Sequence, residues 1–187
     1  MKNLFKIIPA IALAGFLLTA FTTMNSKAVK CLIQMTNYTG EGAYVVVSLL
    51  NPSGEYEETL YVQGKDSEWY SEIPEWWKFY GKYRPNIDAI SGATISGGER
   101  TVTVLQIPED KINKGYSLRF ETSVEDQKYY ADDIQFELTA ENLKAKKEGK
   151  GFIRYVRMLP QSHKRNNAFQ QEIIPDLGEY RKTKKKP

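Results

Sequence analysis

A regular succession of short β-type segments, separated by turn residues, restricts the fold of this chain more than any other feature. The clearest pair is residues 43–50 and 56–63, which the turn sequence Asn51-Pro52-Ser53-Gly54 joins into a predicted hairpin. Alternating, β-branched or aromatic patterns predict further strands at residues 30–39, 99–107, 116–124, 129–138 and 151–159. Short strands with turns between them predict a mainly β fold, an antiparallel sandwich or barrel.

The two ends of the 187-residue chain do not share this pattern. Lys2 and Lys6 precede an apolar stretch that is too short for a membrane span, and Ala20 and Ala28 are candidate cleavage positions. These features predict a secretory signal peptide over residues 1–28, with an uncleaved anchor as the alternative. We therefore expect one domain over residues 29–160, exported to the periplasm or another extracytoplasmic compartment. Residues 161–187 are predicted to be a polar, basic tail, which could touch anionic lipid but would not span a membrane.

The composition excludes several classes of function. A net charge of only +3 gives no electrostatic reason to expect a nucleic-acid partner. His163 is the only histidine, so neither a histidine-based metal site nor a Ser-His-Asp triad is predicted. Cys31 is the only cysteine and is expected as a buried apolar residue on the first strand. Asp132 and Asp133 are compatible with a hard cation but are expected to be a solvated pair.

Two segments interrupt the strands. Residues 67–83 carry seven aromatic side chains, and Pro74 is placed to open a short helix. This aromatic-rich helical insertion has two compatible interpretations: a cap that closes one end of the sandwich, or aromatic faces that flank a planar ligand. Residues 140–150, with four lysines, are predicted to be a solvated helical or loop linker to the last strand.

The small-residue stretch between the insertion and the next strand carries the most specific pattern. Asp88, Ser91, Gly92, Ala93 and Thr94 form the motif Asp-x-x-Ser-Gly-Ala-Thr. It resembles the covalent flavin attachment site of FMN-binding domains in sodium-pumping quinone reductase and Rnf-type complexes. The resemblance implies that a flavin transferase esterifies the phosphate of FMN onto Thr94. An ordinary turn between strands is the alternative interpretation.

The residue types of the motif suit such an attachment. A hydroxyl group must reach the active site of another enzyme, so we expect a narrow and pliable loop. Gly92 and Ala93 would remove bulk and ease unusual dihedral angles there. Asp88 and Ser91 would make polar contacts with the transferase, its metal or the loop backbone.

A second resemblance covers roughly residues 31–158. It rests on two hairpin segments, part of the insertion and the end of the motif: Tyr44-Val45-Val46-Val47, Glu58-Thr59-Leu60, Ile73-Pro74-Glu75-Trp76-Trp77 and Gly92-Ala93-Thr94. These are similar to predicted periplasmic proteins called domain of unknown function 2271. Members look immunoglobulin-like and tend to be linked with PepSY-type membrane proteins and flavin transferases. Many continue the loop as Gly-Ala-Thr-Arg-x-Pro-Gly, whereas Ile95-Ser96-Gly97-Gly98 follows here.

Together the resemblances imply an immunoglobulin-like antiparallel β-sandwich that carries covalent FMN on Thr94. The rings of Trp76 and Trp77 would pack on the flavin, whose potential nearby polar groups would tune. The protein would be an electron carrier that works with a PepSY-type membrane partner, rather than an enzyme with its own substrate. The alternative is a non-catalytic binding module whose aromatic patch meets a protein or glycan. Independent catalysis is the least indicated, because one histidine and no recognisable acid pair leave little chemistry.

Overall fold

The computed structural model describes residues 25–83 and 86–160. Most of the predicted signal peptide, the whole predicted tail and His163 lie outside the described residues. The first strand, β1, spans Ser26–Met35, so it begins before the predicted domain boundary at residue 29. Signal cleavage near Ala20 would leave β1 whole, whereas cleavage after Ala28 would remove three of its residues.

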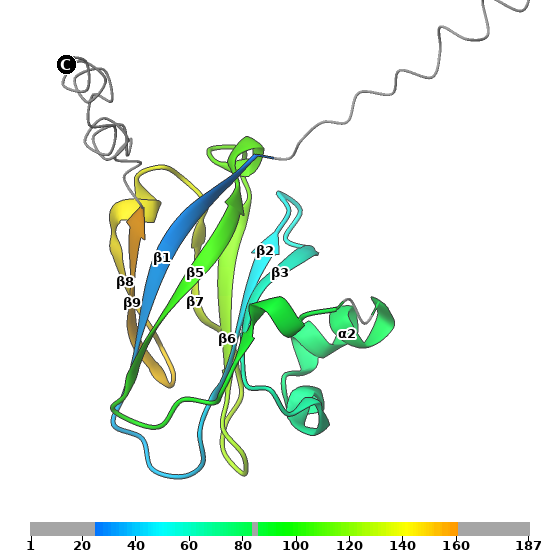
Figure 1. Cartoon of the computed structure of the whole chain (residues 1–187), viewed down its shortest axis with the longest axis vertical. Coiled ribbons are helices and arrows are strands. Elements are labelled where there is room, and N and C mark those ends of the chain that lie inside the picture. The colour runs from blue at the N-terminus through cyan, green and yellow to red at the C-terminus, as the bar shows by residue number, and fades with distance from the viewer. Residues whose placement is uncertain (1–24, 84–85, 161–187) are drawn as a thin grey trace, which may run out of the picture.

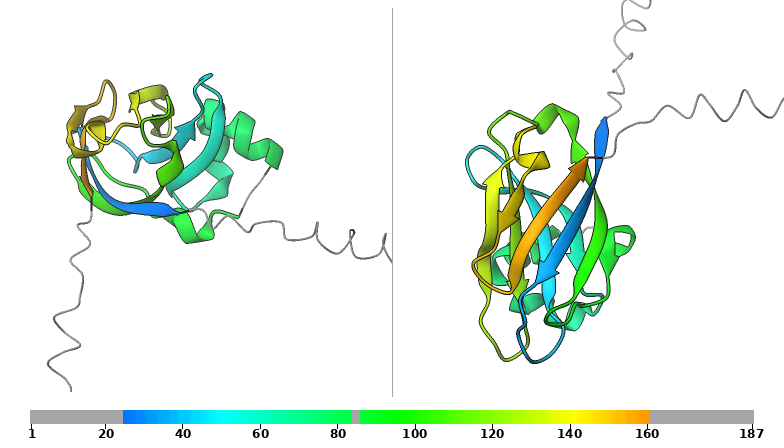
Figure 2. Two further views of the ribbon diagram at one scale, coloured as in Figure 1. Left: turned by 90° about the horizontal axis from the view of Figure 1, so that it is seen from above. Right: turned by 90° about the vertical axis from the view of Figure 1, so that its left-hand side faces the viewer.

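Two β-sheets form the body of the molecule, and the predicted mainly β fold is confirmed (Figures 1 and 2). The first sheet has the order β5-β1-β9-β8, in which β5 is Arg100–Pro108, β9 is Ile153–Pro160 and β8 is Lys146–Glu148. The second has the order β4-β3-β2-β6-β7. Its strands are β4 (Ser91–Gly92), β3 (Tyr56–Gln63), β2 (Tyr44–Leu50), β6 (Ser117–Ser123) and β7 (Tyr130–Glu137). Neighbouring strands pair antiparallel except β3 and β4, which are parallel.

The main core lies between the two sheets and follows from the alternation of apolar residues along the strands. In β1 every second residue from Val29 to Met35 is buried, and these side chains join Val45, Val47 and Leu49 of β2 in one cluster. Cys31 is fully buried in this cluster, as predicted, and its burial raises the pKa of the thiol to about 12. The cysteine therefore stays a neutral, apolar residue.

Strand β2 is buried on both faces, which explains its continuous apolar sequence. Val46 points away from the main core and packs with Val62 of β3 in a second cluster. The helical insertion supplies the cover: a 3-10 helix, η1 (Ser67–Glu72), and an α-helix, α2 (Pro74–Tyr83). Pro74 opens α2 as predicted. The insertion covers the outer face of the second sheet, not an end of the sandwich as expected, because Val46 and Val62 leave an apolar stripe there to be buried.

The lysine-rich linker is more ordered than its composition predicts. A 3-10 turn, η4 (Asn142–Lys144), is followed by β8, which pairs with β9 at the edge of the first sheet. Lysine-bearing short strands are a common way to protect a sheet edge, so charge here does not exclude a strand.

Asp133 is buried, contrary to the expected solvated aspartate pair. Its carboxylate accepts hydrogen bonds from Thr122 Oγ1 (2.7 Å) and from the backbone N–H groups of Lys150, Gly151 and Ile153 (2.8–2.9 Å). Four donors compensate the desolvation of the carboxylate, and they fix the turn that leads into β9. Asp132 stays exposed and pairs with the Lys150 ammonium at 2.8 Å.

Neither a metal cluster nor a membrane span is found within residues 25–83 and 86–160. No group of three or more His, Cys, Asp or Glu side chains in this part could hold a metal ion. The helices there are also too short and too polar to cross a bilayer.

Candidate functional site

The end of the small-residue motif is held between two backbone pairings. Ser91 and Gly92 form β4, which pairs with Val62 and Gln63 of β3, and Gly64 N donates to Gly92 O at 2.6 Å. Directly after Thr94, residues 43 and 95 exchange two backbone hydrogen bonds of 2.7 and 3.2 Å. Thr94 therefore sits on a short stretch of chain fixed on both sides, rather than in the pliable loop expected from its composition.

Gly92 is required by close packing. Its φ is not among the positive values of the described chain, so left-handed backbone is not the reason for glycine. A Cβ atom at this position would lie 2.7 Å from the hydroxyl oxygen of Tyr61. That hydroxyl donates to Gln63 Oε1 at 2.6 Å, and Gln63 Nε2 in turn donates to the carbonyl oxygen of Ala93. The chain of hydrogen bonds ties the motif to β3 and leaves no room for a side chain at residue 92.

Thr94 itself is exposed. Within the described residues, no protein group forms a hydrogen bond with its hydroxyl. Gly42 is the residue that makes room for it, since a Cβ atom there would lie 2.5 Å from Thr94 Oγ1 and 2.7 Å from Thr94 Cβ. The sequence Gly40-Glu41-Gly42 is typical of a simple turn, but in the fold its Gly42 packs against the Thr94 side chain.

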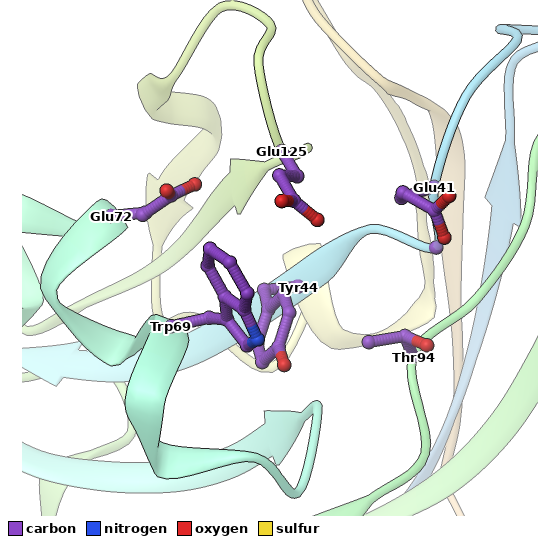
Figure 3. A pocket seen from close by; sticks show the side chains of 7 residues that line it. Glu41, Tyr44, Trp69, Glu72, Thr94 and Glu125 are labelled. Carbon is purple, nitrogen blue, oxygen red and sulfur yellow. The ribbon is translucent and has the colours of Figure 1, made fainter.

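The Thr94 side chain lines a pocket of about 150 Å³. Two aromatic rings, three carboxylates and one glycine complete the lining: Tyr44, Trp69, Glu41, Glu72, Glu125 and Gly42. Figure 3 shows Tyr44 and Trp69 in the middle, Glu72 on one side, and Thr94 and Glu41 on the other. We call this the Thr94 pocket. Its residues come from the loop before β2, from the first residue of β2, from η1, from the motif and from the loop after β6, which meet only in the folded chain.

The Thr94 pocket is acidic, and its lining includes no lysine or arginine. The pKa of Glu125 is raised, first by burial and then by the negative charges of Asp126, Glu41 and Glu72. The pKa of the Tyr44 hydroxyl is raised to about 12, first by burial and then by the charges of Asp66, Tyr70, Glu125 and Glu72. The pKa values of Glu125 and Tyr44, which lie on different elements, are thus both raised. The surroundings of the pocket therefore oppose the addition of negative charge.

The predicted site residues do not all meet at this pocket. Ala93 is exposed next to Thr94, Ser91 is half-buried in β4, and Asp88 begins the 3-10 turn η2 (Asp88–Ile90). Trp76 is fully buried, and its indole N–H donates to Thr59 Oγ1 at 2.9 Å. Trp77 is half-buried on α2, and neither tryptophan of α2 lines the Thr94 pocket.

Trp69 is the tryptophan that the structure brings to Thr94. The two tryptophans predicted to pack on a flavin, Trp76 and Trp77, lie on α2, whereas Trp69 lies on η1, one element earlier. Asp66 caps η1 by accepting from Glu68 N at 3.1 Å, and this cap directs the first turn of the insertion. The sequence Asp66-Ser67-Glu68 before Trp69 carries this capping signal, but nothing in it shows that the turn faces the motif.

Comparison with protein families finds one family whose pattern covers most of the chain. The family of predicted periplasmic proteins called domain of unknown function 2271 matches residues 26–155. The chain belongs to this family. The matched range contains every residue of the Thr94 pocket, and the family description agrees with the predicted periplasmic location. No curated protein and no solved structure matches the chain. The family description names a location and no activity, so the function has to be argued from the site.

Proposed function

We propose that this periplasmic protein is a covalently flavinylated electron carrier, with FMN esterified to Thr94 and a PepSY-type membrane protein as its redox partner. The observation that carries the proposal is the placement of Thr94. Its side chain is exposed, lacks a hydrogen-bonding partner in the described chain and shares a pocket with Trp69. A hydroxyl in that position is accessible to a transferase, and an aromatic face is available to a flat ring.

The dimensions of the Thr94 pocket fit an attached flavin better than a freely bound one. At about 150 Å³ the pocket is smaller than the about 300–1,000 Å³ of cavities that enclose drug-sized ligands. An isoalloxazine ring would be covered on one side only and would keep an edge in solvent, where electrons can be exchanged with another protein.

The charge of the pocket is unfavourable for a freely bound flavin nucleotide. Sites that bind phosphate reversibly use arginine, lysine or helix N-termini, and the lining of this pocket has no basic residue. Three glutamates would instead repel a phosphate group. A covalent bond is therefore needed to keep a flavin nucleotide here, and it also prevents loss of the cofactor by dilution outside the cytosol.

The attachment itself has a simple chemical balance. Thr94 Oγ forms a new bond to the phosphorus of the FMN unit, and the hydroxyl proton passes to a base of the transferase. With a flavin dinucleotide as donor, the pyrophosphate bond breaks and adenylate leaves. In this reaction Asp88 and Ser91 are the proposed contacts for the transferase, and Gly42 leaves Thr94 free to react. When bound, the flavin supplies the electron-transfer chemistry, and this chain supplies its position and its surroundings.

Intact-mass spectrometry after co-expression with a flavin transferase tests the proposal. We expect the wild-type chain to gain the mass of FMN less one water, and Thr94→Ala to gain none. Thr39→Ala is the matched control, because Thr39 is also an exposed loop threonine. The free energy of unfolding of Thr94→Ala should lie within about 0.5 kcal/mol of the wild-type value, because the substitution removes an exposed side chain that has no hydrogen-bonding partner in the described chain. A wild-type chain without added mass, or a full flavin mass on Thr94→Ala, contradicts the proposal.

A second candidate function is a non-catalytic, immunoglobulin-like binding module of the periplasm. The acidic and aromatic lining of the Thr94 pocket favours a cationic ligand for such a module, because carboxylates and an indole face both attract an ammonium group. The colour of the purified exported protein separates the two functions. A flavinylated carrier is yellow and fluorescent on a denaturing gel, whereas a binding module is colourless.

A further inference from the structure

The outer face of the first sheet carries exposed apolar and basic side chains that the packing of the fold does not explain. We propose that this face docks the protein onto an anionic phospholipid surface. The inference goes beyond the proposed function and does not depend on a cofactor at Thr94. It rests on an apolar patch, on the charges around that patch, and on the strands at which the described chain begins and ends.

Exposed apolar side chains gather on this face. Of the four large apolar side chains that are exposed in the described chain, three lie on the first sheet: Val102, Val104 and Leu159, with accessible fractions of 58%, 42% and 43%. They are neighbours, because Lys30 of β1 lies opposite both Val104 and Leu159. Leu32, which is half-buried and opposite Val102, continues the patch. Contiguous exposed apolar patches mark protein or membrane interaction sites, whereas single exposed residues need no explanation.

Basic side chains surround the patch. Lys30 stands at its centre, and Arg157 lies opposite Leu32. Arg100 lies on the same face of β5, two residues from Val102. All three basic residues are exposed, and none of them forms an ion pair with a carboxylate of the described chain.

The edge strand β8 does not neutralise these charges. Its outward residues are Lys146, opposite Arg157, and Glu148, opposite Tyr155. Lys146 Nζ lies 3.2 Å from Glu148 Oε1, so these two residues compensate each other. The strands of the first sheet therefore present three uncompensated positive charges around an apolar centre, which complements a negatively charged surface with an apolar interior.

The form of the face favours lipid over a folded protein as the partner. Its four paired strands make one continuous antiparallel surface (Figure 2). A protein partner is recognised by close shape complementarity and matched hydrogen bonds. A lipid surface has no fixed shape, and it requires only that apolar side chains enter it and that cations meet its phosphate groups. Long lysine and arginine side chains can reach those phosphates while shorter apolar side chains lie deeper.

The described chain also begins and ends at this sheet. β1 begins at Ser26, just after most of the predicted signal peptide, and β9 ends at Pro160, where the predicted basic tail starts. Val29 pairs with Pro160, so both points lie at one end of the sheet. A retained anchor or a lipid-bound tail would hold the patch close to a membrane. No residue of the Thr94 pocket lies on the first sheet, so docking would leave that pocket uncovered.

Flotation of the purified exported chain with lipid vesicles tests the proposal. Vesicles of phosphatidylcholine are compared with vesicles that also contain phosphatidylglycerol. We expect binding only to the second kind, and weaker binding as salt is added. The double variant Lys30→Gln/Arg157→Gln should bind at least about tenfold more weakly, because each basic residue near an anionic surface contributes about fivefold. Val102→Ser/Val104→Ser should weaken binding several-fold.

The matched control is Lys65→Gln/Lys82→Gln. It removes the same charge and keeps the tail, but Lys65 follows β3 and Lys82 lies on α2, on the other side of the molecule. We expect its binding to stay close to wild type. Equal loss in both charge variants would assign binding to net charge, and unchanged binding in every variant would assign it to the tail. Either result overturns the inference, as does wild type that binds no vesicles or that forms a dimer dissociated by Val102→Ser/Val104→Ser.

A dye attached to the face tests the orientation separately. Cys31 is the only cysteine and is buried, so Val102→Cys supplies an accessible thiol for selective labelling. A polarity-sensitive dye at residue 102 should brighten and shift to shorter wavelengths with phosphatidylglycerol vesicles. The same dye on Lys82→Cys should not change. No response at residue 102, or equal responses at both positions, overturns the inference, and neither result bears on the mass spectrum that tests FMN on Thr94.

Discussion

The helical insertion has two sides with opposite properties. On the closed side, Tyr70, Ile73 and Trp76 pack onto Val46 and Val62 and are almost completely shielded from water. On the open side, Trp69 and Glu72 line the Thr94 pocket, and each keeps part of its surface exposed. The two sides are only a few residues apart in sequence, and each carries a tryptophan. The closed side stabilises the fold, whereas the open side lines a pocket.

The difference shows that an aromatic-rich segment is not by itself a binding site. Rings that face an apolar stripe of the sheet are used for packing, since burying them gains hydrophobic free energy. A ring that faces a polar, open surface keeps its face available.

The largest expected effect is that of Trp76→Ala on stability. This change empties a fully buried position and removes the hydrogen bond from Trp76 Nε1 to Thr59, so we expect a loss of about 3–5 kcal/mol. Trp69→Ala is the matched control on the open side and should cost less than about 1 kcal/mol. Urea unfolding followed by circular dichroism measures both. If Trp76→Ala and Trp69→Ala lowered the free energy of unfolding equally, the closed and open sides would not differ in their contribution to stability.

Glu121 gives the closed side a dependence on pH. It is fully buried beneath α2, where its carboxylate accepts from Trp76 N (3.2 Å) and the Tyr129 hydroxyl (2.5 Å) and lies 3.3 Å from Arg119 Nη2. Burial raises the pKa of Glu121 from 4.5 to about 8, although the hydrogen bonds from Tyr129 and Trp76 act in the opposite direction. Between these two values the folded chain holds a proton that the unfolded chain has released.

The free energy of unfolding should therefore fall as the pH rises from about 5 to about 8, with a slope of at most about 1.4 kcal/mol per pH unit. Glu121→Gln cannot ionise, so its stability should change less over this range. Urea midpoints at several pH values measure the slope, and Glu109→Gln is an exposed control that should keep it. A wild-type slope that persists in Glu121→Gln would assign the pH dependence to another group.

Gly42→Ala tests the open side with a smaller expected effect on stability. The added methyl group would lie 2.5 Å from Thr94 Oγ1, so the threonine side chain or the chain at residue 42 must shift. We expect a loss of about 1–3 kcal/mol and a several-fold slower attachment of FMN. A time course of intact mass measures attachment, and circular dichroism confirms that the variant is folded. Attachment at the wild-type rate would show that Gly42 does not control access to Thr94.

Much of the mainly β fold could be predicted from the sequence, because strand patterns are local. The segments expected at residues 43–50 and 56–63 correspond to β2 and β3 within one residue, and Pro74 begins α2. Two strands were missed. β8 is short and rich in lysine, so it carries little apolar signal. β4 consists of two residues whose pairing with β3 depends on chain brought close only by the fold.

The candidate site could be predicted only in part. The motif pointed to Thr94, and the structure places that residue at an exposed pocket. The roles of the glycines were misjudged: Gly92 allows close approach of Tyr61, and Gly42, outside the motif, accommodates Thr94. Trp69 belongs to the aromatic segment predicted to flank a ligand, but the sequence singles out Trp76 and Trp77 instead of it. Nothing in the sequence indicates the three glutamates, because they reach the motif from segments far from it in the chain.

The sequence by itself determined the β-rich class, the turns and the start of the helix, and it made Thr94 a candidate, since each of these depends on the chemistry of neighbouring residues. Only the tertiary structure decided which tryptophan stands beside that threonine and which is buried, and that acidic side chains surround it. The physical reason is that burial and electrostatic fields arise from atoms brought together across the fold, and no local pattern records which segments will meet.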